Sequence, residues 1–395
     1  VEVDGDNVVI TMPAPYPPIM SIFVSSLCSI VDKEWAIEKG CWDGKYENAA
    51  KFNNPEDGKE PLARIENGTG PYKLKEWVPS DRFVYERYEK YWGKHSNIKT
   101  AIRKYIPEWS TSKLMMQSGD LSVLPFQSSH LPEMQEMKNV SLLETPNLFV
   151  TTAFFCQDIE TKGNPNIGSG KLDGEGIPPD FFKDINVRKA FQHCFDPSLY
   201  KEEVTNGKGK ILTAPLPAGL PFQTDVSGYD FDLEKAAEYM KKAWGGKVWE
   251  KGFKMTILHN TGNDMRQAAA HMIAENMMEV NPKFEIEVSH VEWKDYWVRY
   301  RQHLYPIFII GWFADFADPH NFLHTFMNST GAYGQHMRFK NEKIDQLTAA
   351  GIKEARVSER KKIYVALQKL WVEHALGINV IQPVSTRAYR SDVIY

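Results

Sequence analysis

One short segment limits the folds open to this chain more than any other feature of its sequence. Ile307–Ile310 is apolar at every position, and Gly311 ends the run. A strand whose side chains are all apolar is buried on both faces, as in a sheet covered by helices on each side. Asp318 and Pro319 follow as a helix N-cap and first helical residue, which predicts a helix through Phe322. The segment therefore predicts the α/β class.

The rest of the C-terminal half repeats this alternation of strands and helices. Further strands are predicted at 253–258, 284–288 and 377–382. Apolar stripes predict helices between and after them, with Asp232 as the N-cap of one and Ser358 as the N-cap of the last long one. This order favours a largely parallel sheet covered on both faces. Residues 161–182 carry Gly, Asn and Asp without a hydrophobic period, which predicts a long loop.

The N-terminal half predicts antiparallel hairpins, at residues 1–10 and 72–87. The chain begins inside the first hairpin with no initiator Met or targeting segment, so we expect that the leading part of the protein is missing. Four cysteines lack the CxxC spacing of a structural zinc site. Cys28 and Cys41 flank a short helical segment, and a disulfide between them and four separate thiols are both open interpretations.

Composition and charge exclude several classes of protein. Lys and Arg number 47, Asp and Glu 51, and the net charge of −4 comes without a basic face, so no nucleic-acid partner is expected. The longest apolar stretch, Pro306–Ala314, is about half of what a membrane-spanning helix needs, which predicts a soluble protein. Aromatic residues make up 12% of the chain, which suits a stacking or capture surface as well as a core.

Asp315 is the carboxylate that the local pattern leaves without a structural role. It follows the carboxyl end of the predicted central strand, where open α/β sheets bind ligands. Trp312, Phe313 and Phe316 adjoin it, and a carboxylate buried among such residues needs a partner. Two interpretations stay open. Asp315 caps a turn or pairs with an arginine such as Arg338, or it binds an ammonium group of a ligand between aromatic walls.

Metal-binding and catalytic interpretations fit the same segment poorly. His320 and His324 lie four residues apart, but Asn321 stands where a metalloprotease helix carries Glu. Asp315 and Asp318 come from one turn, whereas the carboxylates of a glycosidase flank the substrate from opposite sides. We therefore expect no catalytic residues, no metal site, no cofactor and no enzymatic activity.

Five stretches form an ordered set of motifs along the chain. They are Asn67–Trp77, Gln117–Asp120, Val187–Asp196, Val291–Trp293 and Gly311–Phe322. The set resembles the family 5 extracellular solute-binding proteins, the peptide-binding components of ABC importers.

The resemblance implies a two-lobed periplasmic-binding-protein fold with an extra small domain, closing over ligand about a hinge. Lobe I and the small domain would be incomplete in this chain. The implied domains are a remnant of the small domain at 1–40, a partial lobe I at 41–148 with 384–395, and lobe II at 149–383. The hinge would lie near 149–155 and again near 381–387.

The resemblance also implies the site. In peptide-binding members, the aspartate that falls on Asp315 holds the ligand's α-ammonium, and the backbone around Gly311 and Phe313 pairs with the extended peptide. Tyr300 and Ile309 fall where some oligopeptide binders carry arginines for the ligand's carboxylate, so capture of a terminal carboxylate is not implied. The candidate ligand-binding residues are Gly311, Trp312, Phe313, Asp315, Trp293 and Tyr333.

The function implied is that of an extracytoplasmic substrate-binding component, which captures peptides and delivers them to the membrane permease of an ABC transporter. We expect a monomer in the periplasm or otherwise outside the cytoplasm, with or without a lipid anchor. One alternative keeps the fold but binds oligosaccharides by stacking on aromatic residues. The candidate platforms are Trp293, Trp297, Trp312, Phe313 and Tyr333. Weaker alternatives are a nickel or haem ligand, and a glycoside hydrolase using Asp315 and Asp318.

Overall fold

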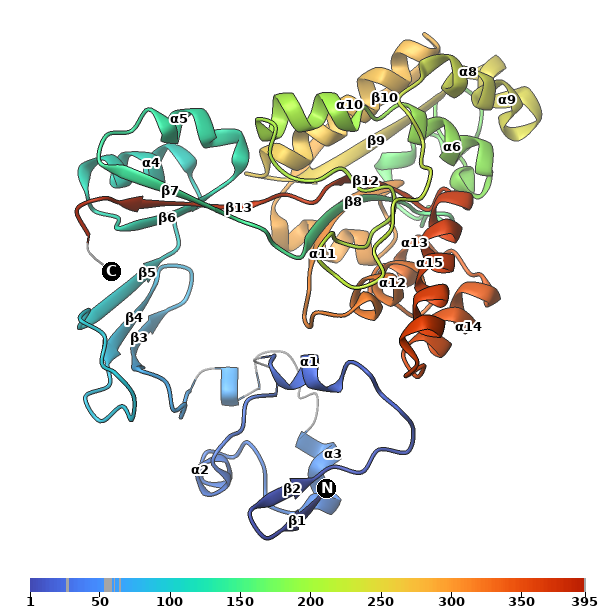
Figure 1. Ribbon diagram of the computed structural model, residues 1–395. Coiled ribbons are helices and arrows are strands. Elements are labelled where there is room, and N and C mark those ends of the chain that lie inside the picture. The colour runs from blue at the N-terminus through green and yellow to red at the C-terminus, as the bar shows by residue number, and fades with distance from the viewer. Residues whose placement is uncertain (26–27, 53–58, 60, 64, 394–395) are drawn as a thin grey trace. The chain divides into compact units, whose positions relative to one another are not determined.

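The structure, a computed structural model, describes residues 1–25, 28–52, 59, 61–63 and 65–393 (Figure 1). Small parts of the implied ranges 1–40, 41–148 and 384–395 lie outside the described residues. The chain divides into two compact units, Val1–Ser25 with Met116–Tyr395, and Ser26–Met115. The domain limits implied by the family resemblance stay a prediction.

The larger unit is built on a five-stranded sheet with the order β10-β9-β11-β8-β12. Its strands are β8 (Phe149–Phe155), β9 (Phe253–Asn260), β10 (Phe284–Val291), β11 (Ile307–Phe313) and β12 (Gly377–Ile381). β9 pairs in parallel with β10 and β11, whereas β8 runs antiparallel between β11 and β12. The largely parallel sheet was thus predicted correctly except for β8, which runs opposite to the other four strands.

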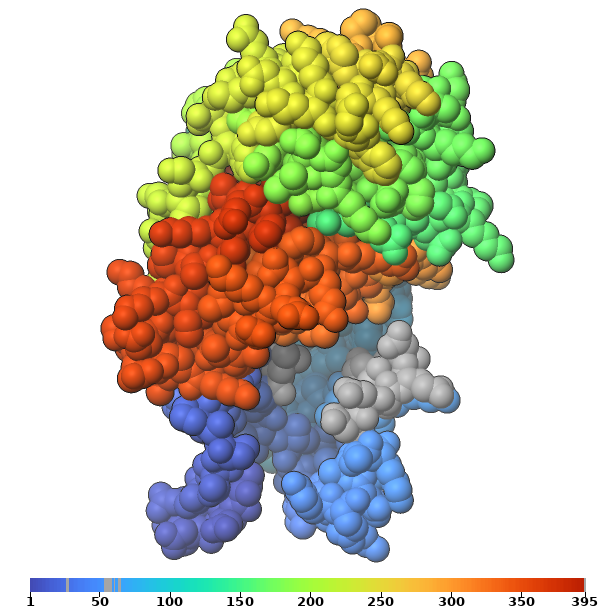
Figure 2. All heavy atoms as spheres, turned by 90° about the vertical axis from the view of Figure 1, so that its right-hand side faces the viewer, coloured from blue at the N-terminus to red at the C-terminus, as the bar shows by residue number. Residues whose placement is uncertain are grey.

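Helices cover both faces of this sheet, as the apolar run of β11 predicts. One face carries α6 (Ile185–His193), α8 (Leu233–Lys242), α9 (Lys247–Lys251) and α10 (Asp264–Val280). The other carries α11 (Trp293–Arg301), α12 (Pro319–Met327), α13 (Gly334–Met337), α14 (Glu342–Gly351) and α15 (Val357–Glu373). Figure 2 shows the two layers, the first in green and yellow and the second in orange and red.

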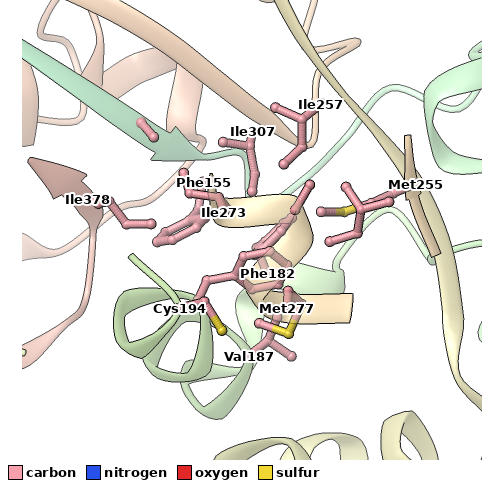
Figure 3. Packing of buried hydrophobic residues seen from close by; sticks show 14 of the residues in the cluster. Phe155, Phe182, Val187, Cys194, Met255, Ile257, Ile273, Met277, Ile307 and Ile378 are labelled. Carbon is pink, nitrogen blue, oxygen red and sulfur yellow. The ribbon is translucent and has the colours of Figure 1, made fainter. Parts of the chain in front are cut away.

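Alternate residues of β11 belong to two separate hydrophobic cores. Ile307 and Ile309 pack with Phe155 and the residues of α6 and α10, a core shown in Figure 3. Phe308 and Ile310 pack with the residues of α11, α12 and α15. All four side chains of the run are at most 1% exposed. The strand is therefore anchored on both faces, which fixes where its carboxyl end emerges.

Of the three predicted N-caps, Asp232 and Asp318 are right and Ser358 is wrong. Asp232 caps α8, because its side chain accepts a hydrogen bond from the backbone N–H of Lys235 at 2.9 Å. Ser358 is the second residue of α15 rather than its cap, and Arg356 holds the N-cap position. Glu354 accepts the N–H of Arg356 in the turn before the helix, so α15 begins at Val357.

A smaller antiparallel sheet completes the larger unit, with the order β6-β13-β7. Its strands are β6 (Val123–Phe126), β7 (Val140–Thr145) and β13 (Ser385–Arg390), with the helices α4 (Trp109–Ser118) and α5 (Leu131–Gln135) beside them in the chain. The β7–β8 and β12–β13 links run side by side between the two sheets (Figure 1). The amide of Gln382 in one link donates to the carbonyl of Asn147 in the other, at 2.8 Å. These links lie at the implied hinge, whose motion stays a prediction.

The N-terminal elements are short. Both predicted hairpins are present, β1 (Glu2–Asp4) with β2 (Asn7–Val9), and β3 (Tyr72–Val78) with β4 (Arg82–Arg87), to which β5 (Thr100–Lys104) adds a third strand. The helices are α1 (Ile19–Phe23), α2 (Lys33–Glu38) and α3 (Ala49–Phe52).

Two further sequence expectations have structural answers. All four cysteines are free thiols, so the disulfide between Cys28 and Cys41 is not formed. The predicted loop at 161–182 contains two short 3-10 turns, and Ile167, Ile177 and Phe181 anchor it in the core. In the described part of the chain, no helix combines the length and apolar character needed to cross a lipid bilayer.

Candidate ligand-binding site

The ring of Phe149 lies directly over Gly311 in β11. A Cβ at this position would lie 2.0 Å from Cζ of Phe149, which comes from the antiparallel partner strand β8. The ring of Phe149 stands 6.3 Å from that of Phe313, which is 62% exposed. The absence of a side chain at Gly311 therefore lets Phe149 and Phe313 form an exposed aromatic surface at the end of the strand.

Asn321, in the first turn of α12, holds this strand end in place. Its side-chain oxygen accepts hydrogen bonds from Trp312 Nε1 at 2.9 Å and from the backbone N–H of Asp315 at 3.1 Å. Its amide nitrogen donates to Asp315 Oδ2 at 3.1 Å. Asn321 is 6% exposed, so these three bonds orient both a candidate wall and the candidate carboxylate. Asn321 belongs to the motif at 311–322, but the sequence does not reveal its role, because its contacts depend on the path of the turn.

Asp315 is exposed, and the described part of the chain supplies no cationic partner for it. Arg338, the arginine suggested by the sequence, pairs instead with Asp158 at 3.0 Å, so that interpretation of Asp315 is wrong. Among the described residues, none forms an ion pair with Asp315, and the amide of Asn321 is its hydrogen-bond donor. The carboxylate is therefore oriented by one side chain and left open to a positively charged group.

Asp318 has a different role, as predicted. It caps α12 by accepting the N–H of His320 at 2.8 Å. Both of its oxygens also accept from the guanidinium of Arg360, at 2.8 and 2.9 Å, in a pair whose side chains are each 8% exposed. Asp318 is therefore fully engaged, and it is not available as an acid or base beside Asp315.

Tyr333 lies under the strand rather than on its surface. It is 2% exposed, its hydroxyl donates to the carbonyl of Gly311 at 2.8 Å, and its ring meets that of Trp312 edge-on at 5.3 Å. Burial raises the pKa of the phenol, which keeps it neutral and able to donate. Tyr333 is thus placed to position Gly311 and Trp312, and its ring is not exposed for stacking.

Trp293 begins α11 and is 44% exposed. Its ring stacks on that of Tyr296, with centroids 6.0 Å apart, and the guanidinium of Arg266 lies 5.3 Å from the Trp293 ring centroid. Tyr296 is buried, and its hydroxyl bonds to both the N–H and the carbonyl of Ile309. The helix that carries Trp293 is thereby fastened to β11.

Near its carboxyl end, β11 pairs with a described strand on one side only. On one side, β8 pairs with the strand from Ile307 to Phe313. On the other side, the register with β9 contains a single pair, Phe308 with Leu258. Beyond it, the hydroxyls of Tyr296 and Tyr333 bond to Ile309 and Gly311, and no described strand pairs with the edge at 311–313 on that side.

A cavity of about 700 Å³ adjoins this strand end. Its lining includes Asp315, Phe313 and Phe316 from the end of β11, Leu148 from the β7–β8 link, and Arg387 from β13. The cavity thus combines the open carboxylate with apolar walls, next to the links between the two sheets. Of the six candidate residues, Phe313 and Asp315 line this cavity. Gly311, Trp312 and Tyr333 lie together at the end of the strand. Trp293 lies apart from them, on α11.

The sequence matches the family "Bacterial extracellular solute-binding proteins, family 5 Middle" over residues 1–334. Among curated proteins, it is 25% identical over 332 residues to the dipeptide-binding protein of Escherichia coli K12, covering 82% of this chain and 54% of that protein. It is also 25% identical over 327 residues to haem-binding protein A of Haemophilus influenzae, covering 80% of this chain and 56% of that protein. The chain thus spans little more than half the length of these relatives.

Solved structures share the fold. A periplasmic binding protein of Helicobacter pylori in complex with the peptide STSA has a TM-score of 0.76 and 20% identity, covering 97% of this chain and 68% of that one. A dipeptide-binding protein of Pseudoalteromonas in complex with Met-Leu has a TM-score of 0.74 and 18% identity, covering 96% and 69%. These likenesses confirm the predicted α/β periplasmic-binding-protein fold, and the family match covers most of the chain. The chain belongs to the family 5 bacterial extracellular solute-binding proteins.

Proposed function

We propose that this chain captures peptides outside the cytoplasm, with the ligand's α-ammonium on Asp315, as the substrate-binding component of an ABC importer. The observation that carries the proposal is an exposed carboxylate that the amide of Asn321 orients and that forms no ion pair with any residue the structure describes. It lies at the carboxyl end of a central strand and lines a cavity with apolar walls. No chemical step is part of this function.

The edge of β11 at 311–313 supports peptides as the ligand class. Tyrosine hydroxyls already bond to Ile309 and to the carbonyl of Gly311, so an extended peptide can add as a strand beyond them, at 311–313, with backbone hydrogen bonds that do not depend on side-chain identity. The exposed ring of Phe313 and the half-buried ring of Trp312 lie at the same place and offer apolar contacts. Relatives named as dipeptide- and oligopeptide-binding proteins, and structural neighbours solved with peptides, agree with this class.

The energetics are compatible with capture and release. A hydrogen bond to a charged group contributes about 1.5–3 kcal/mol, whereas a dissociation constant of about 1 μM corresponds to roughly −8 kcal/mol. Asp315 therefore supplies selectivity for the ammonium, and strand pairing and apolar contacts supply most of the affinity. We further propose that the protein acts as a monomer in the periplasm or an equivalent extracytoplasmic space, and that a membrane permease receives the ligand.

Titration calorimetry with tri-alanine and N-acetyl-tri-alanine tests the role of Asp315. We expect the wild-type chain to bind the free amine at least about tenfold more tightly, a difference of about 1.4 kcal/mol, and Asp315→Asn to lose that preference. Glu279→Gln is the matched control, since it removes one negative charge from an exposed position near the end of α10. Equal binding of both peptides, or an unchanged preference in Asp315→Asn, would contradict the assignment.

Oligosaccharides are the alternative ligand class to be tested, because Trp293 and Trp297 are partly exposed (44% and 38%) and could stack on sugar rings. Thermal-shift screening separates the two classes, because a ligand that binds only the folded state raises the melting temperature. Short peptides should raise it and β-linked glucose oligosaccharides should not. The opposite pattern would replace peptides with oligosaccharides.

A further inference from the structure

The cavity beside Asp315 has a lining surface that is mostly apolar. Phe313 and Phe316 line it from the end of β11 and the turn that follows, and Leu148 lines it from the β7–β8 link. Among the described residues of the lining, Asp315 and Arg387 are the two that carry a charge. A group held by Asp315 therefore has apolar surface as its nearest large neighbour.

The side chain of Gln382 holds two parts of this lining together. Its amide nitrogen donates to the carbonyls of Asn147 at 2.8 Å and of Ala218 at 3.0 Å, and its amide oxygen accepts the N–H of Ala218 at 2.8 Å. Asn147 and Ala218 both line the cavity, and Gln382 is 5% exposed. Because both ends of this buried amide are engaged, the two segments keep a fixed separation.

Gly219 keeps the space beside Leu148 free. A Cβ at this position would lie 3.7 Å from Leu148 Cδ2, and the φ of +104° is one that L side chains rarely adopt. Leu148 itself packs against the core on the α11 and α12 face of the large sheet. One wall of the cavity is thus anchored in the core, and the residue that faces it contributes no side chain.

The proposed binding mode brings the first side chain of a peptide to this cavity. The carbon atom that carries the α-ammonium also carries that side chain, so an ammonium on Asp315 keeps it within a few bonds of the carboxylate. The following residues would pair with the edge of β11 at 311–313, with successive side chains on opposite faces. The first side chain therefore lies at the end of the strand, where Asp315 and Phe313 border the cavity.

We propose that this cavity receives the side chain of the peptide's first residue and selects apolar side chains there. The inference rests on the proposed peptide-binding function and adds the class of peptide, one that begins with a residue such as Leu. Moving an apolar side chain from water onto apolar walls is favourable in proportion to the area buried. A polar side chain of similar size would lose hydrogen bonds with water and find few partners in these walls.

Titration calorimetry on the whole chain with four tripeptides tests this preference. They are tri-alanine and the peptides in which Leu, Gln or Glu replaces its first residue, so that amine, carboxylate and length stay the same. We expect the wild type to bind Leu-Ala-Ala about tenfold more tightly than tri-alanine, because the larger side chain buries more apolar surface. Gln-Ala-Ala should bind no more tightly than tri-alanine. Glu-Ala-Ala, whose side chain could reach Arg387, should bind less tightly than Leu-Ala-Ala.

A variant that fills the cavity assigns the preference to it. Ala317 is exposed and lines the cavity, so Ala317→Leu takes up space there without disturbing a core. This variant should bind Leu-Ala-Ala and tri-alanine within about twofold of each other. Ala349→Leu is the matched control, since it adds the same side chain at an exposed position of α14, and it should keep the wild-type preference.

The possible results separate this inference from the function on which it rests. Equal wild-type binding of Leu-Ala-Ala and tri-alanine, or tighter binding of the Gln or Glu peptide than of Leu-Ala-Ala, would overturn the apolar preference and leave peptide capture intact. A preference that persists in Ala317→Leu would place the first side chain outside this cavity. The wild-type comparison holds even if the variant fails to fold. If none of the four peptides binds the wild type, peptide capture itself is wrong.

Discussion

Replacing Asn321 by Asp places a second carboxylate against Asp315. The substitution keeps the size of the side chain and the oxygen that accepts from Trp312 and from the backbone of Asp315. It exchanges the donor nitrogen, which lies 3.1 Å from Asp315 Oδ2, for a charged oxygen. One hydrogen bond thus becomes a like-charge contact, with little other change in shape.

The distance sets the size of the effect. Two unit charges 3.1 Å apart repel by about 1.3 kcal/mol in water and by about 5 kcal/mol at the effective dielectric of a protein surface. Because Asp315 is exposed, we expect the free energy of unfolding to fall by about 1–2 kcal/mol near neutral pH. The repulsion also raises the pKa of the carboxyl pair in the folded state above that in the unfolded chain.

The folded variant therefore holds a proton that the unfolded chain has released, and its stability relative to wild type recovers as the pH falls through the raised pKa. Urea unfolding followed by tryptophan fluorescence, at about pH 7.5 and about pH 4.5, measures this difference. The double variant Asn321→Asp with Asp315→Asn removes the repulsion and should regain most of the lost stability.

The reasoning would be refuted if Asn321→Asp matched the wild type at both pH values, since the amide would then not face Asp315. A loss of stability that is independent of pH, and that the double variant does not reverse, would point to packing rather than charge. Peptide affinity gives a second readout. The introduced carboxylate should leave binding of the ligand's ammonium intact or strengthen it. If the substitution also displaced Trp312, only the apolar contacts of the ligand should weaken.

Two further predictions concern the buried groups next to the site. Arg360→Met leaves Asp318 buried without its partner and should lower the free energy of unfolding, measured in urea, by about 3–5 kcal/mol. Adding Asp318→Asn removes the unpaired charge and should recover part of this loss. Burial, with the charges of His324 and Arg360, lowers the pKa of His320 to about 3, so the unfolded chain binds an extra proton between that value and about 6.5. Wild-type stability should therefore decline as the pH falls below about 6.5, and His320→Gln should show a shallower decline; identical pH profiles would contradict this role of His320.

The sequence predicted those features that depend on neighbouring residues. The apolar run of β11 indicated burial on both faces, and Asp318 with Pro319 indicated the start of α12, because strand burial and helix capping act over a few positions. Asp315 was singled out because Asp318, in the same segment, already served as the helix cap and left Asp315 without a structural role. None of the residues that the structure describes forms an ion pair with Asp315, which agrees with that reasoning, while its contact with a ligand stays a prediction.

Local sequence patterns do not reveal which strands or side chains pair when they lie far apart in the chain. The direction of β8 depends on its pairing with β11, about 150 positions away, and the partner of Asp318 lies 42 positions further on, in α15. Tyr333 was expected beside the ligand because aromatic residues suit a pocket wall, but the fold places its ring under Gly311. No local pattern distinguishes a buried aromatic ring from an exposed one when the covering residues come from other elements.

The order of residues in this protein thus determined its class of fold and the family to which it belongs, and it singled out Asp315 as the candidate carboxylate for a ligand. Tertiary structure alone decided that Asn321 orients this carboxylate and that Asp318 is paired with Arg360. The physical reason is that secondary structure follows from interactions over a few residues, whereas the satisfaction of a charge depends on every group that folding brings within a few ångströms of it.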